Sequence, residues 1–279
     1  MKIIFLLFLS ILAEKVYSQD SSDYVILAKE RMISFEKMAK QLAKKEVILF
    51  GELHDDSIAH VLELELSKCL YKQFPNNFAI GAEMFETHQA TYLQKYLATD
   101  NLNALTDSTK LWSNFTTDYF PTLQFAQKNQ IPYYATNIPR KYASLVFKKG
   151  INALDTLTEK EHALICPLPF PFDSTLSQYK ECIQMGIDMH ASGINFAMAQ
   201  AIKDATMAWN ITNALHTNEK LLHFNGSFHS NHYQGIYWYI KQYRPKTKIA
   251  TIAVIKQSEF KHKRDCYIAD YVIIVNDKK

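Results

Sequence analysis

Two short apolar runs, far apart in the chain, end in the same pattern, and this pair most constrains the fold. Glu46–Asp56 reads EVILFGELHDD and Lys220–Asn231 reads KLLHFNGSFHSN. Each run has the length and the β-branched or aromatic content of a buried strand, and each is followed by Gly-x-x-His. In an open parallel sheet, the residues just past the carboxyl ends of the strands face a common crevice. We therefore expect His54 and His229 to meet there.

Strand-like and helix-like segments alternate through most of the chain. Residues 58–74 are typical of a helix between two strands, and a strand-helix-strand unit of this length predicts a parallel pair with aligned carboxyl ends. Glu83 should then emerge beside His54. The pattern predicts an α/β fold, with a mostly parallel central sheet flanked by helices. The expected strands are 47–50, 78–82, 131–136, 221–224, 249–255 and 271–275, and residues 24–43 are expected to form an amphipathic helix before the first.

The alternation stops between residues 141 and 200, where helical segments rich in aromatic residues and methionine are expected instead. An excursion of this length beside the crevice predicts an inserted helical cap on a single domain that spans residues 19–279. Two of the four cysteines, Cys166 and Cys182, fall in the cap. They form either a disulfide, as an exported chain allows, or two separate buried thiols.

The first 18 residues have the features of a secretory signal peptide: a lysine at position 2, an apolar run over residues 3–13 and the small Ser18. The apolar run is too short to cross a bilayer, no other stretch has the roughly 20 apolar residues that a spanning helix needs, and no cysteine lies near the cleavage site to carry a lipid. We expect a periplasmic or secreted protein. The net charge of +3 is small for 279 residues, which argues against nucleic-acid binding.

Polar residues at the expected strand ends form a candidate site. Glu52, His54, Glu83 and His229 offer imidazoles and carboxylates for general acid and base catalysis, with Arg140 and Asp204 in support. Alternatively His54, Glu83 and His229 could bind a divalent metal such as zinc or manganese. A third interpretation is that these groups only satisfy one another's hydrogen bonds at the strand ends, without catalysis.

Five motifs together resemble the ChaN-type haem-binding, iron-regulated proteins. In chain order they are Gly51–Asp55 (GELHD), Gly81–Phe85 (GAEMF), Asn137–Arg140 (NIPR), Asp204–Ala208 (DATMA) and Asn225–His229 (NGSFH). The resemblance extends to the wider group of the Tiki, TraB and erythromycin-esterase-like proteins. It implies an exported protein of haem or iron uptake that holds haem at a homodimer interface, with an outer-membrane haem receptor as a possible partner.

The same resemblance implies a tyrosine as the iron ligand, assisted by a histidine of the partner chain. Tyr179, His190 and Tyr142 lie in or beside the cap where such groups are expected, although none falls inside a matching motif. A phenolate oxygen suits ferric iron, and apolar cap residues can cover the faces of the macrocycle. The esterase-like relatives imply a different function, in which His54 activates water and Glu83 supports it. Haem binding and hydrolysis in the crevice are therefore the two functions that we expect.

Overall fold

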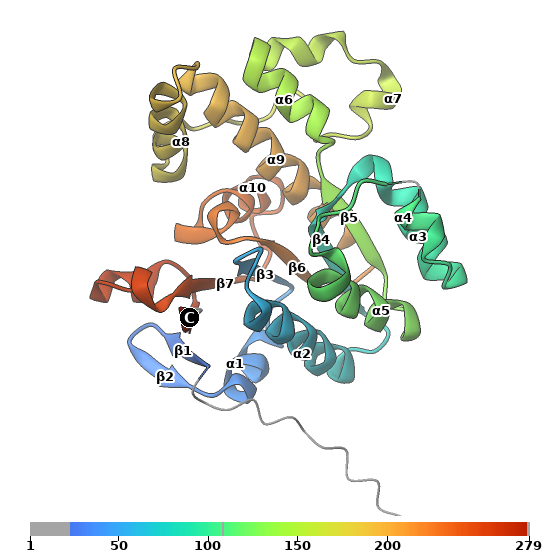
Figure 1. Ribbon diagram of the computed structural model, residues 1–279, viewed down its shortest axis with the longest axis vertical. Helices are drawn as coiled ribbons and strands as arrows, with labels where there is room; N and C mark the ends of the chain where they lie inside the picture. Colours follow the sequence, from blue (N-terminus) through green and yellow to red (C-terminus); the bar gives the residue numbers. More distant parts are fainter. Residues whose placement is uncertain (1–22, 108, 278–279) are drawn as a thin grey trace, which may run out of the picture.

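The computed structural model describes residues 23–107 and 109–277, which are built around an eight-stranded sheet (Figure 1). The strand order is β2-β1-β8-β7-β3-β6-β4-β5, and all neighbours from β8 to β5 are parallel. The predicted α/β class with a mostly parallel sheet is confirmed. The bounds are β1 Tyr24–Ala28, β2 Arg31–Ile33, β3 Val47–Glu52, β4 Phe78–Glu86, β5 Tyr133–Asn137, β6 Lys220–Gly226, β7 Ile249–Lys256 and β8 Tyr271–Val275.

Strand β6 lies between β3 and β4, so the predicted pairing of the first two parallel strands is wrong in detail. Val47 of β3 aligns with Leu221 of β6, and Phe78 of β4 aligns with Lys220. All three strands still run in one direction and end at the same edge of the sheet. The late insertion of β6 brings the two Gly-x-x-His segments side by side, with Glu52 paired in register with Gly226.

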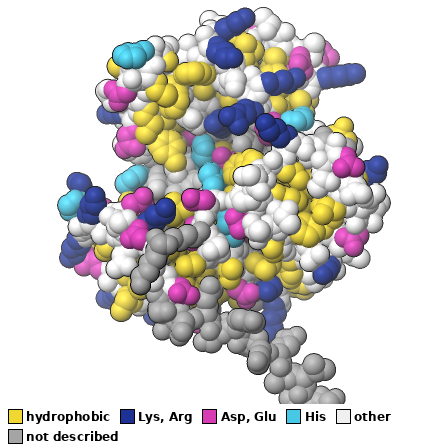
Figure 2. All heavy atoms as spheres, viewed as in Figure 1, with side chains coloured by type: hydrophobic (Ala, Val, Ile, Leu, Met, Phe, Trp, Pro, Cys, Tyr) yellow, Lys and Arg dark blue, Asp and Glu magenta, His cyan; other side chains and the backbone are white. Residues whose placement is uncertain are grey.

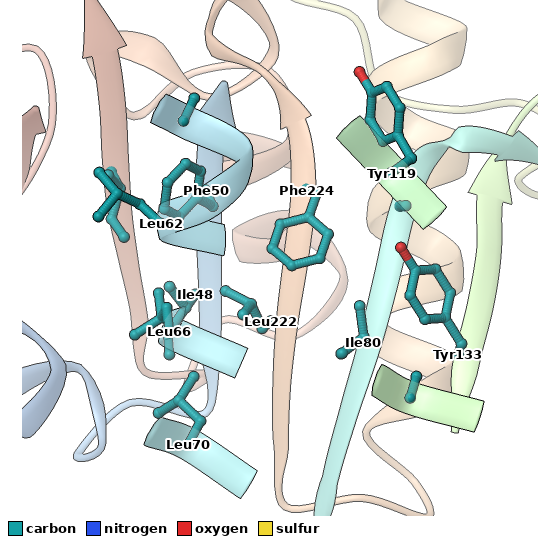
Figure 3. Close-up of a cluster of buried hydrophobic side chains, with 14 of the residues drawn as sticks. Ile48, Phe50, Leu62, Leu66, Leu70, Ile80, Tyr119, Tyr133, Leu222 and Phe224 are labelled. Atoms are coloured by element: carbon teal, nitrogen blue, oxygen red, sulfur yellow. The ribbon is translucent and has the colours of Figure 1, made fainter. Parts of the chain in front are cut away.

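Successive side chains of a strand point to opposite faces of the sheet, so a buried strand carries apolar residues on both faces, and helices cover both. In β3, Ile48 and Phe50 join one apolar cluster, and Val47 and Leu49 join the other. Helices α1 (Phe35–Leu42), α2 (Ser57–Gln73), α3 (Ala90–Thr99), α4 (Asn103–Thr106) and α5 (Phe120–Lys128) contribute to the first cluster. Figure 3 shows three leucines of α2 packed toward the sheet: Leu62, Leu66 and Leu70.

The second face is covered by helices that follow β5. These are α6 (Arg140–Lys149), α8 (Ser177–Asp188), α9 (Gly193–Ala214) and α10 (Ile236–Tyr243), with the single-turn α7 (Glu159–His162) between α6 and α8. In Figure 1 helices α6, α7 and α8 stand beyond the sheet at the top of the view, and α9 runs from them back toward the strands. The predicted cap is therefore helical, but its expected end at residue 200 falls inside the uninterrupted α9. Cys166 and Cys182 are both buried free thiols, not a disulfide.

The predicted amphipathic helix at residues 24–43 is wrong over its first half. Tyr24–Ala28 forms β1, which pairs antiparallel with β8 and with β2. Only α1, capped by the Ser34 side chain, is helical there. The run YVILA carries β-branched residues that suit a strand, and pairing covers the exposed edge of β8, an effect that helical spacing in the sequence does not reveal.

No helix among residues 23–107 and 109–277 is both long enough and apolar enough to span a membrane. The predicted signal peptide, residues 1–18, lies outside the described residues.

Candidate functional site

The carboxyl ends of β3, β4 and β6 bring together four predicted site residues from three parts of the chain. Glu52 is the last residue of β3, and Glu83 lies in β4; they are 3% and 7% exposed. His229 ends a short 3-10 turn after β6 and is also buried. His54 lies in the turn between β3 and α2, with an exposed side chain. The prediction that the two Gly-x-x-His histidines share one strand-end crevice agrees with this geometry.

His229 is held between two buried carboxylates. Its Nδ1 lies 2.6 Å from Asp204 Oδ1, and its Nε2 lies 3.3 Å from Glu83 Oε1. Asp204, on α9, is completely buried and also accepts a hydrogen bond from the Tyr179 hydroxyl at 2.9 Å. Glu83 Oε2 accepts the backbone N–H of Gly226 at 2.8 Å. Asp204 therefore positions His229, as the sequence suggested for a supporting residue.

The charges in this network favour one protonation state. Burial alone would lower the pKa of His229, but the Glu83 and Asp204 carboxylates raise that pKa to about 10. Burial acts to raise the pKa of Glu83, yet the positive charge and hydrogen bond of His229 hold it well below its ordinary value. At neutral pH His229 is therefore an imidazolium between carboxylates, which makes it a structural cation and a poor general base.

His54 is the imidazole that reaches the open crevice. Its Nδ1 lies 2.7 Å from Glu52 Oε1, which also accepts the Tyr119 hydroxyl at 2.6 Å. The other edge of the ring lies against Gly226, where an added Cβ would be only 2.9 Å from His54 Nε2. Trp112 packs edge-on against the ring, with centroids 4.7 Å apart. Glycine at 226 is thus required for His54 to approach the backbone this closely.

Two adjoining hollows of about 820 and 350 Å³ open beside His54, between the sheet edge and the cap. They share four lining residues: Glu83, Glu86, Trp112 and Arg140. Figure 2 shows this groove with histidine side chains along it. Arg140 is exposed and is the first residue of α6, and its backbone N–H donates to Glu86 at 2.9 Å. It therefore offers a guanidinium to an anionic ligand while also beginning a helix.

The structure groups metal-binding side chains differently from the sequence prediction. The ligand atoms of the expected set, His54, Glu83 and His229, do not all lie within 4.8 Å of one another. Among the described residues, Glu52, His60 and Glu63 have potential ligand atoms that all lie within 4.8 Å of one another. Sequence reasoning missed His60 and Glu63, although their i, i+3 spacing on a helix just after the first motif was a usable signal.

The three predicted haem ligands have very different surroundings. Tyr179 is fully buried, and its hydroxyl donates to Asp204. Tyr142 is 3% exposed, and its hydroxyl donates to Glu161 at 2.9 Å. His190 is exposed and has a positive φ of 55°, at the turn between α8 and α9. Of the three, His190 has a side chain that a ligand can reach without rearrangement of the helices.

Comparisons with known proteins agree on the fold. The family model described as haem-binding uptake, Tiki superfamily, ChaN matches residues 38–240, well over half of the chain. A solved structure titled "Cofacial heme binding to ChaN of Campylobacter jejuni" superposes with a TM-score of 0.66 at 20% identity, covering 92% of this chain and 98% of that one.

Two more distant structures also align with this chain. The type III effector HopBA1 has a TM-score of 0.50 at 9% identity, covering 88% of this chain and 94% of its own. The erythromycin esterase EreC in its open conformation has a TM-score of 0.48 at 12% identity, covering 82% and 74%. A comparison with curated proteins returned no match.

Proposed function

Because this chain belongs to the ChaN haem-binding uptake family of the Tiki superfamily, we propose that it binds haem as part of haem or iron uptake. The observation that carries the proposal is an exposed apolar surface at the end of α8 and the start of α9. We call it the α8–α9 patch. It consists of Met185, Ile187, Met189 and Ile194, which are 46–54% exposed.

The patch stands out from the rest of the described surface. The described residues include nine exposed large hydrophobic side chains, and four of these nine fall within the ten-residue segment 185–194. Exposed apolar residues that gather in this way mark binding surfaces for flat apolar ligands or for other proteins. Covering them would favour haem binding at about 25 cal/mol per Å² of apolar surface removed from water.

His190 lies in the middle of the patch sequence and offers an imidazole to haem iron. Ligation by Tyr179 would require its hydrogen bond to the buried Asp204 to break and α8 to separate from α9. We therefore assign the iron ligand to His190. The Campylobacter jejuni ChaN structure is titled as a cofacial haem complex. By analogy, two copies of this chain would place their patches face to face with haem between them.

A hemin titration tests this proposal. Purified apo protein should show a saturable shift of the Soret band, and His190→Ala should weaken the affinity at least about tenfold or change the ligand-sensitive spectrum. His216→Ala, an exposed histidine beyond the other end of α9, is the matched control. Tyr179→Phe and Tyr142→Phe test ligation by tyrosine. Absence of a saturable shift would refute haem binding, and a loss seen only in His54→Ala would place haem in the crevice.

Hydrolysis in the crevice is the second candidate function. It is favoured by His54, whose ring faces the 820 Å³ hollow with Glu52 behind it and Glu83 nearby. In such an arrangement His54 would activate water and Arg140 would bind an anionic substrate group. A panel of ester and peptide substrates assayed with wild type and His54→Ala tests this. Equal activity in both would leave the strand-end network with a purely structural role.

The proposed role in uptake includes export. Residues 1–18 would direct the chain to the periplasm or out of the cell, where an outer-membrane haem receptor would be its partner. Amino-terminal sequencing of the protein purified from an exporting host tests the first step. A mature chain that begins at residue 19 or 20 is expected, and an intact first residue in the exported fraction would contradict it.

A further inference from the structure

A second group of ionisable side chains lies beneath the crevice and shares only Glu52 with the site described above. Glu52 closes β3, while His60 and Glu63 come from the first two turns of α2. All three are buried, with 4% exposure or less. Two carboxylates and an imidazole thus share a space from which water is largely excluded.

The hydrogen bonds of His60 fix the direction of its free lone pair. His60 Nε2 lies 3.2 Å from the backbone carbonyl oxygen of His54, which can only accept a hydrogen bond. Nε2 therefore carries a proton, and in the neutral ring Nδ1 has a lone pair. That nitrogen lies 3.0 Å from Glu63 Oε2 and 3.8 Å from Glu52 Oε2. A lone pair that faces two carboxylates requires a proton or a metal ion between them.

Two carboxylate oxygens in this space have no hydrogen-bond partner: Glu52 Oε2 and Glu63 Oε1. A buried carboxylate oxygen without a partner is costly, so native proteins pair such groups or use them to bind metal. The other oxygen of Glu52 accepts from Tyr119 and faces His54 Nδ1, which leaves Oε2 directed toward His60 and Glu63. The surrounding contacts thus orient the three groups toward one another, as supporting residues do around metal sites.

We propose that Glu52, His60 and Glu63 bind a divalent transition metal, with Mn²⁺ and Zn²⁺ as the ions best matched to one imidazole and two carboxylates. The potential ligand atoms lie within 4.8 Å of one another. In a tetrahedral site, ligand bonds of about 2.0–2.2 Å place ligand atoms roughly 3.4 Å apart, so side-chain movements of up to about an ångström bring all three onto one ion. Bound there, the ion would fix Glu52 and through it the orientation of His54.

Metal binding is tested on the full-length protein after treatment with EDTA and removal of any affinity tag. Mn²⁺, Zn²⁺ and, as a spectroscopic probe, Co²⁺ are added while thermal unfolding is followed. Wild type should gain several degrees in Tm with a saturable, one-to-one dependence, and Co²⁺ should develop visible absorption bands. Glu63→Gln should weaken the affinity at least about tenfold.

Two variants separate this site from other metal ligands. Glu65→Gln removes an exposed carboxylate from the same helix, one that pairs with Lys68, and should retain the full metal effect. His54→Ala removes the crevice imidazole, whose Nδ1 contacts Glu52 Oε1 rather than Oε2, and should retain metal binding because all three proposed ligand side chains remain.

The competing explanation is that a proton alone neutralises the three groups. In that case metals leave the Tm of wild type unchanged and Glu63→Gln has a higher Tm than wild type, which overturns the proposal. Metal binding that survives both Glu63→Gln and His60→Gln also overturns it. If Glu63→Gln does not fold, the Co²⁺ spectrum of wild type decides, since absence of Co²⁺ bands and of a Tm shift also rejects the site.

Discussion

His229 and Asp204 are joined by a 2.6 Å hydrogen bond that ties the turn after β6 to α9. Both side chains are buried, and α9 is the helix that leads from the cap to the sheet. Since Glu83 lies on the other side of the same imidazole, one ring links three elements that are remote in sequence. This ring therefore stabilises the position of the cap over the strand ends.

We predict that this link weakens at alkaline pH. The folded-state pKa of His229 is about 10, above the value of about 6.5 expected in the unfolded chain. A group whose pKa is raised on folding contributes stability that is complete below pH 6.5 and is lost between pH 6.5 and 10. The expected loss is about 1.4 kcal/mol per pH unit in that window.

Urea unfolding of wild type and His229→Gln across pH 6–10 checks this. The variant leaves two buried carboxylates without a cation, so its deficit near pH 6.5 should be about 3–5 kcal/mol. That deficit should shrink as the pH rises. Burial lowers the pKa of the Lys220 amine to about 8, so this group contributes stability that increases as the pH rises. Lys220 is present in both proteins, and its contribution cancels in the difference between them. A pH-independent difference would contradict the assigned charge on His229.

A second histidine should make the protein sensitive to acid. His223, on β6, is completely buried between Thr136 and Asn225, and burial lowers its pKa to about 4. Its neutral form contributes stability above pH 6.5, and this is lost as the pH falls from 6.5 toward 4. Wild type should therefore lose stability relative to His223→Gln in urea unfolding between pH 7 and 4.5. Parallel pH profiles of the unfolding free energy for the two proteins would refute this prediction.

Gly226→Ala should displace His54. The new Cβ would lie 2.9 Å from two atoms of the His54 ring, whereas the φ of Gly226, −54°, suits any residue. The cost is therefore steric, about 1–3 kcal/mol. In the His54→Ala background the methyl group has room, so most of this cost should disappear. Denaturant unfolding of both single variants and the double variant measures the coupling, and additive effects would show that the ring is not the obstacle.

The fold and the crevice were readable from sequence because their signals are local. The apolar runs of β3 and β6 and the glycines after them indicated buried strands that end in sharp turns. Parallel strand ends share one edge, so His54, Glu83 and His229 could be placed together without knowing the strand order. The order itself was not accessible, since the position of β6 between β3 and β4 depends on long-range packing.

The site residues that sequence reasoning missed are those whose role depends on burial in the folded protein. His60 and Glu63 carry polar side chains on a helix, where such residues usually face water, and only the packing of α2 and Tyr119 over Glu52 encloses them. Similarly, Tyr179 and His190 lie on one expected helix and appeared equivalent as ligands. The partnership of Tyr179 with Asp204 distinguishes them, and a contact between residues 25 positions apart leaves no local pattern.

The α8–α9 patch should control self-association in the presence of haem. In a twofold dimer the same patch lies on both sides of the interface, so one substitution places two charges in the apolar contact, one from each subunit. Met189→Glu puts a carboxylate on an exposed position of the patch and should weaken hemin-dependent dimerisation at least about tenfold. Met32→Glu, on the 74% exposed Met32 of β2, is the matched control and should dimerise as wild type does. Sedimentation with and without hemin measures both, and equal dimerisation of the two variants would place the interface elsewhere.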